Sequence, residues 1–132
     1  MREVMALLHD GLMSLEGKLG KCRIDDRLIV SRKPVGKLRR DTMWPHQQFL
    51  AVRLEPASLD HILNEVAAAG VELQDDGVLH VYMEHRGAIE FGAHDWYNGC
   101  AITGPAVPTA LLARLQQEGV IDSFRQEPDI AL

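Results

Sequence analysis

The sequence predicts an α+β domain in which helices pack on one face of an antiparallel sheet, and two observations support this prediction. The chain has 132 residues, 46% hydrophobic and 25% charged, which is ordinary for one globular domain with its own core. Residues 48–126 show strand and helix patterns in the order β-α-β-β-α-β, which is compatible with a ferredoxin-like split βαβ fold. We therefore expect a single domain over residues 1–132, in which residues 1–47 add an N-terminal helix, a strand and a basic loop to the core.

The N-terminal region is predicted to contain a helix over residues 2–16 and a short strand over residues 27–32. The helix is indicated by apolar residues at spacings of three and four, namely Met5, Leu8, Leu12 and Leu15. The strand is indicated by the apolar run Leu28-Ile29-Val30. Residues 32–47 look irregular, because Pro34 disfavours helix at the residue before it, and a loop of this length is usually functional or mobile.

From residue 48 onward, capping and turn residues separate the elements. Ser58 can cap the first helix of the core, because its side-chain oxygen can accept a hydrogen bond from an orphan backbone N–H. Pro108 suits the first turn of the second helix, where a missing N–H costs nothing. In chain order we expect a strand at 48–54, a helix between Ser58 and Gly70, a hairpin of 78–84 and 88–94, a helix at 108–118 and a strand at 120–124.

The hairpin can close in two registers, and the apolar residues decide between them. A two-residue turn at Arg86-Gly87 would mix apolar and charged residues on each face. A three-residue loop over 86–88 leaves one face mostly apolar, and a buried face normally sets the register. We therefore predict the three-residue loop, which pairs Met83 with Phe91, Val81 with Ala93 and His85 with Ile89.

The other face of the hairpin is then predicted to carry polar side chains: His80, Tyr82, Glu84, Glu90 and His94. His80 would lie opposite His94, and Glu84 opposite Glu90, at the short separation of antiparallel pairs. Two imidazoles and two carboxylates could bind zinc, manganese or iron, or do acid–base work. The spacing matches no metal-binding motif, so a solvated outer face of the sheet is the simpler interpretation, and we expect no cofactor.

Residues 94–100, which follow the hairpin, concentrate groups that suit a binding loop. Asp95, Trp96 and Tyr97 come directly after a strand end. Loops on rigid scaffolds often carry binding residues, and aromatic side chains are frequent anchors of protein interfaces. The alternative is that Trp96 covers the core while the loop makes an ordinary turn.

Charge is divided unevenly along the chain. Residues 1–40 hold ten Lys or Arg and five Asp or Glu, a net of +5, whereas residues 41–132 hold four and fourteen, a net of −10. The acidic part suits a basic partner, while the basic part either meets nucleic acid or pairs with the acidic part inside the fold. The most basic stretch contains Arg32, Lys33, Lys37, Arg39 and Arg40, but it has no interleaved aromatic residues, which favours a solvated loop.

The two cysteines, Cys22 and Cys100, are far apart and in no CxxC pattern. Two cysteines could form one disulfide with each other, although two reduced thiols in a cytoplasmic protein are the simpler interpretation. Cys100 and His94 would be a nucleophile and its base only with an orienting third group, which the sequence does not supply. No apolar run reaches the roughly 20 residues of a membrane span, and no signal-peptide pattern is present, so we expect a cytoplasmic protein without a membrane partner.

Four motifs in the C-terminal part carry a resemblance to a known group. They are Val81-Tyr82-Met83-Glu84, Ile89-Glu90-Phe91-Gly92, His94-Asp95-Trp96 and Leu111-Leu112-Ala113-Arg114-Leu115. In these the chain resembles small bacterial immunity proteins, which neutralise the toxin domains of contact-dependent inhibition and related polymorphic toxin systems. That group is structurally diverse, so the resemblance implies a toxin partner but no fold and no catalytic residues. Many such toxins are nucleases with basic clefts, which an acidic surface can approach rapidly and block.

We therefore expect a non-enzymatic protein-binding module, an immunity protein that neutralises a basic toxin domain. Its expected partner-binding residues are Asp75, Asp76, Glu84, Glu90, Asp95, Trp96 and Tyr97. Two alternatives remain at this stage. One is a small metal-dependent enzyme that uses His80, His94, Glu84 and Glu90, and the other is a nucleic-acid-binding regulator that uses the basic stretch.

Overall fold

The structure is a computed structural model that describes residues 2–20, 22–38, 48–69, 77–93, 100–119, 121–127 and 130. Its helices are α1 (Arg2–Leu7), α2 (Leu59–Ala69) and α3 (Thr109–Gln117). Its strands are β1 (Leu12–Lys18), β2 (Ile29–Ser31), β3 (Gln48–Arg53), β4 (Gly77–His85), β5 (Ala88–Ala93), β6 (Cys100–Thr103) and β7 (Ser123–Gln126). Three 3₁₀ turns are η1 (Asp26–Leu28), η2 (Gly36–Leu38) and η3 (Pro56–Ser58). The α+β class expected from the sequence is confirmed.

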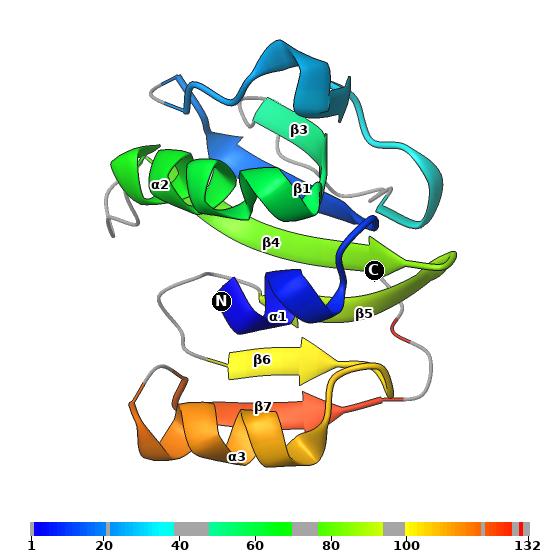
Figure 1. The fold of residues 1–132 in the computed structure, drawn as a ribbon, viewed down its shortest axis with the longest axis vertical. Coiled ribbons are helices and arrows are strands. Elements are labelled where there is room, and N and C mark those ends of the chain that lie inside the picture. The colour runs from blue at the N-terminus through cyan, green and yellow to red at the C-terminus, as the bar shows by residue number, and fades with distance from the viewer. Residues whose placement is uncertain are drawn as a thin grey trace.

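The described strands form one seven-stranded sheet in the order β2-β3-β1-β4-β5-β6-β7 (Figure 1). Neighbouring strands run antiparallel except for β6 and β7, which are parallel. β3 and β4 are joined through α2 and are separated in the sheet by β1, so they form a split β-α-β unit. Because the inserted strand comes from outside residues 48–126, the ferredoxin-like arrangement expected for that core is not confirmed.

The expected helix over residues 2–16 is wrong, because α1 ends at Leu7 and residues 12–18 form β1. The turn between them is fixed by β3 and its end: Asp10 N–H donates to the Leu54 carbonyl at 2.8 Å, and Leu54 N–H donates to the Gly11 carbonyl at 2.9 Å. Asp10 also has a φ of 64°, a left-handed conformation that no helix can contain. The helix therefore ends at Leu7, a position that the spacing of the apolar residues does not indicate.

Strand β1 has a period of two that overlaps with the spacing of the expected helix. Met13 and Leu15 face the helices and are fully buried, while Ser14 and Glu16 face the other side. Alternation of this kind is the signature of a strand between two packed layers. Since Leu12 and Leu15 also fit a three-residue spacing, the sequence supports both interpretations and the tertiary packing decides.

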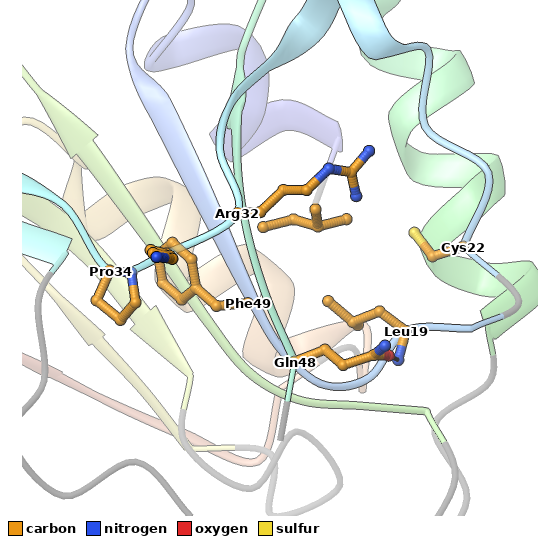
Figure 2. Close-up of a pocket in the computed structure, with 8 residues that line it drawn as sticks. Leu19, Cys22, Arg32, Pro34, Gln48 and Phe49 are labelled. Carbon is orange, nitrogen blue, oxygen red and sulfur yellow. Dashed lines mark hydrogen bonds between the residues drawn. The ribbon is translucent and has the colours of Figure 1, made fainter. Parts of the chain in front are cut away.

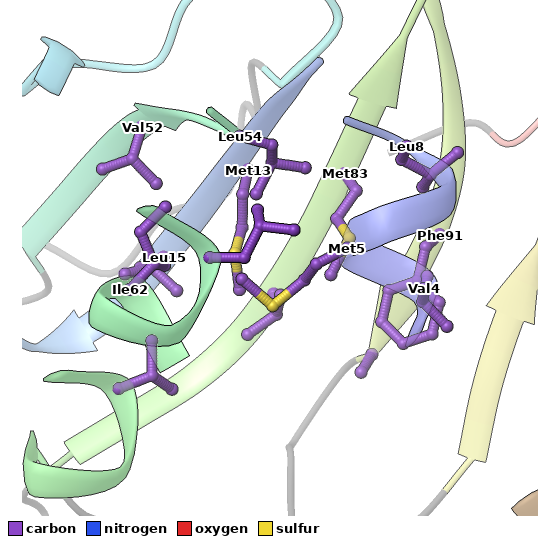
Figure 3. Packing of buried hydrophobic residues seen from close by; sticks show 14 of the residues in the cluster. Val4, Met5, Leu8, Met13, Leu15, Val52, Leu54, Ile62, Met83 and Phe91 are labelled. Atoms are coloured by element: carbon purple, nitrogen blue, oxygen red, sulfur yellow. The ribbon is translucent and has the colours of Figure 1, made fainter. Parts of the chain in front are cut away.

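All three helices lie over one face of the sheet and bury the main core against it (Figure 1). Figure 3 shows Met5 of α1 pointing toward the side chains of β1 and β4, among them Met13 and Met83. The other labelled members of this cluster are Val4, Leu8, Leu15, Val52, Leu54, Ile62 and Phe91. The expectation that helices pack on one face is confirmed. No helix in the described parts of the chain is long and apolar enough to cross a bilayer.

The opposite face of the sheet is covered as well, by the short turn η2. Leu38 of η2 and Ile130 pack with side chains of the sheet: Phe49, Ala51, Tyr82 and Ile89. Tyr82 has no exposed surface, although the sequence interpretation placed it on a solvated face. The reason is that η2 folds back onto β4 and β5, a long-range contact that no local pattern announces.

The remaining predicted elements are present with shifted ends. β3, α2, β4, β5 and α3 occupy the predicted positions, and the strands expected at 27–32 and 120–124 are β2 and β7. Strand β6 has only four residues between glycine-containing segments, so the sequence carries little signal for it. Ser58 lies in η3, where its hydroxyl accepts a hydrogen bond from Arg27 at 3.1 Å and donates to Glu55 at 3.3 Å.

Candidate functional site

The β4–β5 hairpin closes with a two-residue turn at Arg86-Gly87, so the predicted three-residue loop is wrong. The φ angles of 53° and 81° are both positive, as a type I′ hairpin turn requires. The observed pairs are Val81–Ala93, Tyr82–Gly92, Met83–Phe91, Glu84–Ile89 and His85–Ala88. The register shifts between Met83 and Glu84, which leaves Glu90 as an extra residue, a β-bulge. The bulge lets the tight turn coexist with the two apolar pairs that the sequence analysis predicted.

The predicted pairing of Glu90 with Glu84 is wrong, because the bulge turns the Glu90 side chain toward the loop between β6 and α3. Its carboxylate accepts a hydrogen bond from the backbone N–H of Ala106 at 3.0 Å, and its carbonyl accepts one from Gly104 N–H at 2.9 Å. Only 8% of the residue is exposed. A Cβ at Gly104 would lie 2.2 Å from the same carboxylate. Glu90 therefore fixes the loop before α3 and offers little surface to a partner or a metal ion.

His80 and Glu84, the other described members of the predicted metal cluster, lie on β4 and are half-buried. His80 is opposite Glu16 of β1, and its ring centroid is 6.5 Å from that of Tyr82. Glu84 is opposite Leu12 and Ile89. His94, the fourth member, lies outside the described residues. Within the part of the chain that the structure describes, no group of three or more His, Cys, Asp or Glu could hold a metal ion.

Five of the seven predicted partner-binding residues lie outside the described residues: Asp75, Asp76, Asp95, Trp96 and Tyr97. The strand ends that flank them are described. Gly77 of β4 pairs with Lys18, and Ala93 of β5 pairs with Ala101 of β6, so both flanking points lie at the end of the sheet away from the hairpin turn. The two acidic segments, 70–76 and 94–99, therefore join the described sheet at the same end.

Glu84 is far from that end of the sheet. It follows Gly77 by seven positions along β4, a distance of about 23 Å at the rise of a strand. Glu90 is separated from it too, by burial in the bulge. The structure thus divides the predicted set, because the two glutamates of the hairpin do not lie at the end of the sheet to which segments 70–76 and 94–99 are joined.

The sequence analysis missed a row of buried polar groups on the second face of the sheet. Ser14 and Glu16 of β1 have no exposed surface, and they lie opposite Tyr82 and His80 of β4. A fully buried carboxylate is expensive unless other groups compensate it, so residues of this kind are uncommon in a sheet that only supports packing. The alternation of polar and apolar residues along β1 could have indicated this row. It was overlooked because residues 2–16 were interpreted as a helix.

A hollow of about 320 Å³ opens at the edge of the sheet where β2 is short (Figure 2). We call it the edge hollow, and its lining residues are Leu19, Cys22, Arg32, Lys33, Pro34, Gln48, Phe49 and Leu50. Figure 2 shows the side chains of Arg32 and Cys22 pointing toward one another across it. A second hollow of about 490 Å³ adjoins it and shares Leu19, Cys22, Arg32 and Leu50. These volumes lie in the range of small-ligand and peptide side-chain pockets.

The thiol of Cys22 is free and half-buried in this hollow. Burial, followed by the nearby negative charge of Glu65, raises the pKa of Cys22 from 9.0 to about 11. A thiol with this pKa is almost entirely protonated at neutral pH, and the thiolate is the reactive form. Cys22 therefore serves as an apolar wall of the edge hollow rather than as a nucleophile.

The wall that residues 23–26 form in the second hollow is held in place by hydrogen bonds to the region of α2. Glu65 of α2 accepts from the backbone N–H of Arg23 at 2.7 Å, and His61 Nε2 accepts from that of Asp25 at 3.1 Å. Arg27 forms an ion pair with Glu55 at 2.5 Å. These contacts fix residues 23–27 against the helix, so this wall of the second hollow is a preformed feature of the fold.

The described residues thus offer a hollow with a basic rim, and one end of the sheet at which the strands next to segments 70–76 and 94–99 begin or end. Among the described residues, the lining of the edge hollow does not bring together the nucleophile, base and orienting group that a catalytic site needs. In comparisons with known proteins, no family model, no curated sequence and no solved structure matches this chain.

Proposed function

We propose that the chain is a non-enzymatic protein-binding module that acts in the cytoplasm as an immunity protein and neutralises a basic toxin domain. The observation that carries the proposal is the common end of the sheet at which β4 begins and β5 ends. Asp75 and Asp76 precede β4 in the sequence, and Asp95, Trp96 and Tyr97 follow β5. One rigid scaffold therefore anchors both segments of the proposed surface.

The composition of these segments suits a basic partner. Residues 41–132 carry four basic and fourteen acidic side chains, and negative surfaces speed the encounter with a positively charged cleft. Trp and Tyr are the side chains that most often supply the desolvated centre of a protein interface. Acidic groups around two aromatic anchors are therefore the composition expected of a surface that blocks a nuclease cleft.

The described reactive groups support a binding role over catalysis. Glu90 uses its carboxylate to hold the loop before α3, and the raised pKa of Cys22 keeps its thiol protonated. The predicted pairing of Glu84 with Glu90, on which the metal-dependent alternative depended, is replaced by Glu84–Ile89. Each of these groups is occupied with packing or is separated from its supposed partner.

The test is titration of the purified chain against the product of the neighbouring gene, followed by the Asp95→Lys, Trp96→Ala double variant. Loss of one charged and one aromatic anchor should weaken binding by about 100-fold or more. Asp26→Lys is the matched control, because it reverses an exposed charge in η1 without touching the proposed surface. Equal affinity of the double variant and the control would remove this surface from the proposal.

A further inference from the structure

Among the described residues, part of the outer edge of strand β3 has no strand partner, and this part lies beside the edge hollow. On one side, Gln48 to Arg53 of β3 pair with β1 along their whole length. On the other side, β2 pairs only with Ala51 and Val52. No strand among the described residues pairs with the outer side of Gln48, Phe49 or Leu50. Since alternate residues of a strand direct their N–H and C=O groups to each side, part of the β3 backbone faces the hollow without a strand partner.

The walls of the hollow combine apolar and positive groups. Leu19, Phe49 and Leu50 line it with hydrocarbon, and Arg32 and Lys33 stand on its rim. Arg32 forms an ion pair with Asp26 at 3.2 Å, but both side chains are largely exposed, so the pair is easily exchanged for another carboxylate. The lining therefore suits a segment that carries both apolar and acidic side chains.

Two exposed apolar residues flank the basic lining residues in the sequence. Val30 of β2 is 54% exposed and Val35 is 38% exposed, and both belong to the same short stretch as Arg32 and Lys33. Apart from Leu7, they are the large hydrophobic side chains exposed in the described parts of the chain. Exposed apolar side chains among polar ones are typical of surfaces that bind another protein.

The same features argue for a protein segment rather than a nucleic acid. Phe49, the aromatic residue of the lining, is only 3% exposed and offers little ring surface on which a base could stack. An extended peptide, by contrast, can use the open β3 edge through its own backbone.

We propose that the edge hollow binds an extended, acidic segment of a partner protein, which adds as a short strand beside Gln48–Leu50 in line with β2. Its apolar side chains would pack on Leu19 and Leu50, and its carboxylates would meet Arg32 and Lys33. This surface lies at the β2 edge and carries the opposite charge to the proposed toxin-binding end, so it is independent of the proposed function.

The first experiment uses fluorescein-labelled peptides and the intact chain, with binding followed by fluorescence anisotropy. The probe is a peptide of alternating glutamate and valine, and its control has lysine in place of glutamate. A third peptide has proline at its central valine, which removes a backbone N–H and the extended pairing. We expect binding of the glutamate peptide, and at least about tenfold weaker binding of the lysine and proline peptides.

The second experiment locates the site with variants of the chain. Arg32→Glu with Lys33→Glu should weaken binding of the glutamate peptide about tenfold, because two exposed attractions become repulsions. Arg125→Glu on β7 is the matched control at the opposite edge of the sheet and should bind normally. Bound peptide should also slow the alkylation of Cys22, measured by mass spectrometry of its own proteolytic fragment.

Several outcomes would overturn the proposal. They are no binding of the glutamate peptide, equal binding of the proline peptide, an equal loss in the Arg125→Glu control, or unchanged alkylation of Cys22 in the complex. Tighter binding of a single-stranded oligonucleotide at low salt, lost in the same double variant, would assign the surface to nucleic acid instead. The peptide controls leave the protein unaltered, so a variant that fails to fold does not obscure the answer.

Discussion

The carboxylate of Glu90 accepts a hydrogen bond from the backbone N–H of Ala106, so a bulge in the middle of the sheet holds the loop that precedes the third helix. The donor–acceptor distance is 3.0 Å, and the same loop also bonds to the Glu90 carbonyl through Gly104. Glu90 is the residue that the shifted register leaves without a strand partner on β4. The bulge therefore has a structural use, because it frees a glutamate side chain to fix a neighbouring loop.

Glu90 and Gly104 should be energetically coupled. Glu90→Ala leaves the Ala106 N–H without this acceptor and should lower the free energy of unfolding by about 1–3 kcal/mol. Gly104→Ala alone should cost a similar amount, about 1–3 kcal/mol, because its Cβ would lie 2.2 Å from the Glu90 carboxylate. In the double variant that clash disappears, so the two costs should not add.

Urea denaturation of the four proteins in this cycle measures the coupling. We expect the cost of Gly104→Ala to fall by at least about 0.5 kcal/mol once residue 90 is alanine. Some cost should remain, since the new Cβ would still lie 3.2 Å from the Ile89 carbonyl oxygen. Strict additivity would show that the carboxylate is not what crowds Gly104.

Gly11 is predicted to be irreplaceable, whereas Gly20 is not. A Cβ at Gly11 would lie 2.2 Å from the Glu84 carbonyl oxygen in β4 and 2.9 Å from the Leu8 carbonyl oxygen in the turn after α1. Relief of these contacts would disturb the pairing of β4 with β1 or the turn itself. Gly11→Ala should therefore destabilise the fold by about 3 kcal/mol or more. Gly20→Ala, whose Cβ would meet nothing within 4 Å, should change stability by less than about 1 kcal/mol. Thermal unfolding of both variants measures these effects. Equal losses of stability in the two variants would contradict the prediction.

The hairpin turn should accept a better residue at position 86. Arg86 has a φ of 53°, which asparagine adopts at lower cost than arginine, and Asn-Gly is the preferred pair for a type I′ turn. Arg86→Asn should raise the free energy of unfolding by about 0.5–1 kcal/mol, and Gly87→Ala should lower it by about 1 kcal/mol. Chemical denaturation measures both. A loss of stability in Arg86→Asn would mean that the arginine side chain has a contact worth more than the backbone strain.

The extent to which the fold follows from the sequence depends on how local each signal is. α2 and α3 carry apolar stripes and turn residues of their own, and they lie where the patterns predict them. β1 lacks such a local signal, because the alternation of its apolar residues coincides with a helical spacing. The strand is favoured over the helix only by the tertiary contacts of Gly11 and Leu54. Likewise, no local pattern shows that η2 folds over Tyr82.

The candidate sites divide in the same way. The acidic and aromatic residues 75–76 and 95–97 are visible in the sequence, and strand pairing adds that their flanking strand ends share one end of the sheet. The bulge at Glu90 was not predicted, because the sequence analysis compared only registers in which every residue of one strand pairs with one residue of the other. A bulge places two residues of one strand opposite one residue of its partner. The edge hollow was also invisible, since it arises from the short length of β2 and brings Cys22 next to residues far along the chain.

Cys22 should react slowly with alkylating reagents. Raising the pKa from 9.0 to about 11 lowers the thiolate fraction at neutral pH by about 100-fold relative to a free cysteine. Glu65→Gln should lower this pKa and speed the reaction, because it removes the second cause of the shift while keeping an acceptor for the Arg23 N–H. The measurement is the pH–rate profile of iodoacetamide labelling on the Cys22 peptide. A profile that is unchanged in Glu65→Gln would leave burial as the only cause.

The ion pair between Arg27 and Glu55 should make stability depend on pH in the acid range. The hydrogen bond from Arg27, together with its positive charge, lowers the pKa of Glu55 below its ordinary 4.5. A carboxyl group whose pKa is lower in the folded state stabilises the fold above the unfolded-state pKa. It loses that contribution as the pH falls through the folded-state value. Melting temperatures between pH 7 and pH 3 should therefore fall less steeply for Glu55→Gln and for Arg27→Ala than for the unaltered chain.

The control for this pair is Asp60→Asn, which breaks the exposed contact with Arg2 at 2.8 Å and reports what the loss of any surface ion pair does. The Arg27 pair differs in having three partners, since Arg27 also contacts Asp25 at 3.3 Å and donates to Ser58 at 3.1 Å. A network of this kind holds one side-chain geometry better than an isolated pair does. Its removal should therefore change the pH dependence of the melting temperature more than the loss of the Arg2–Asp60 pair does. If Asp60→Asn and Glu55→Gln flatten the acid limb equally, residues 25–27 owe their position against η3 to packing rather than to charge.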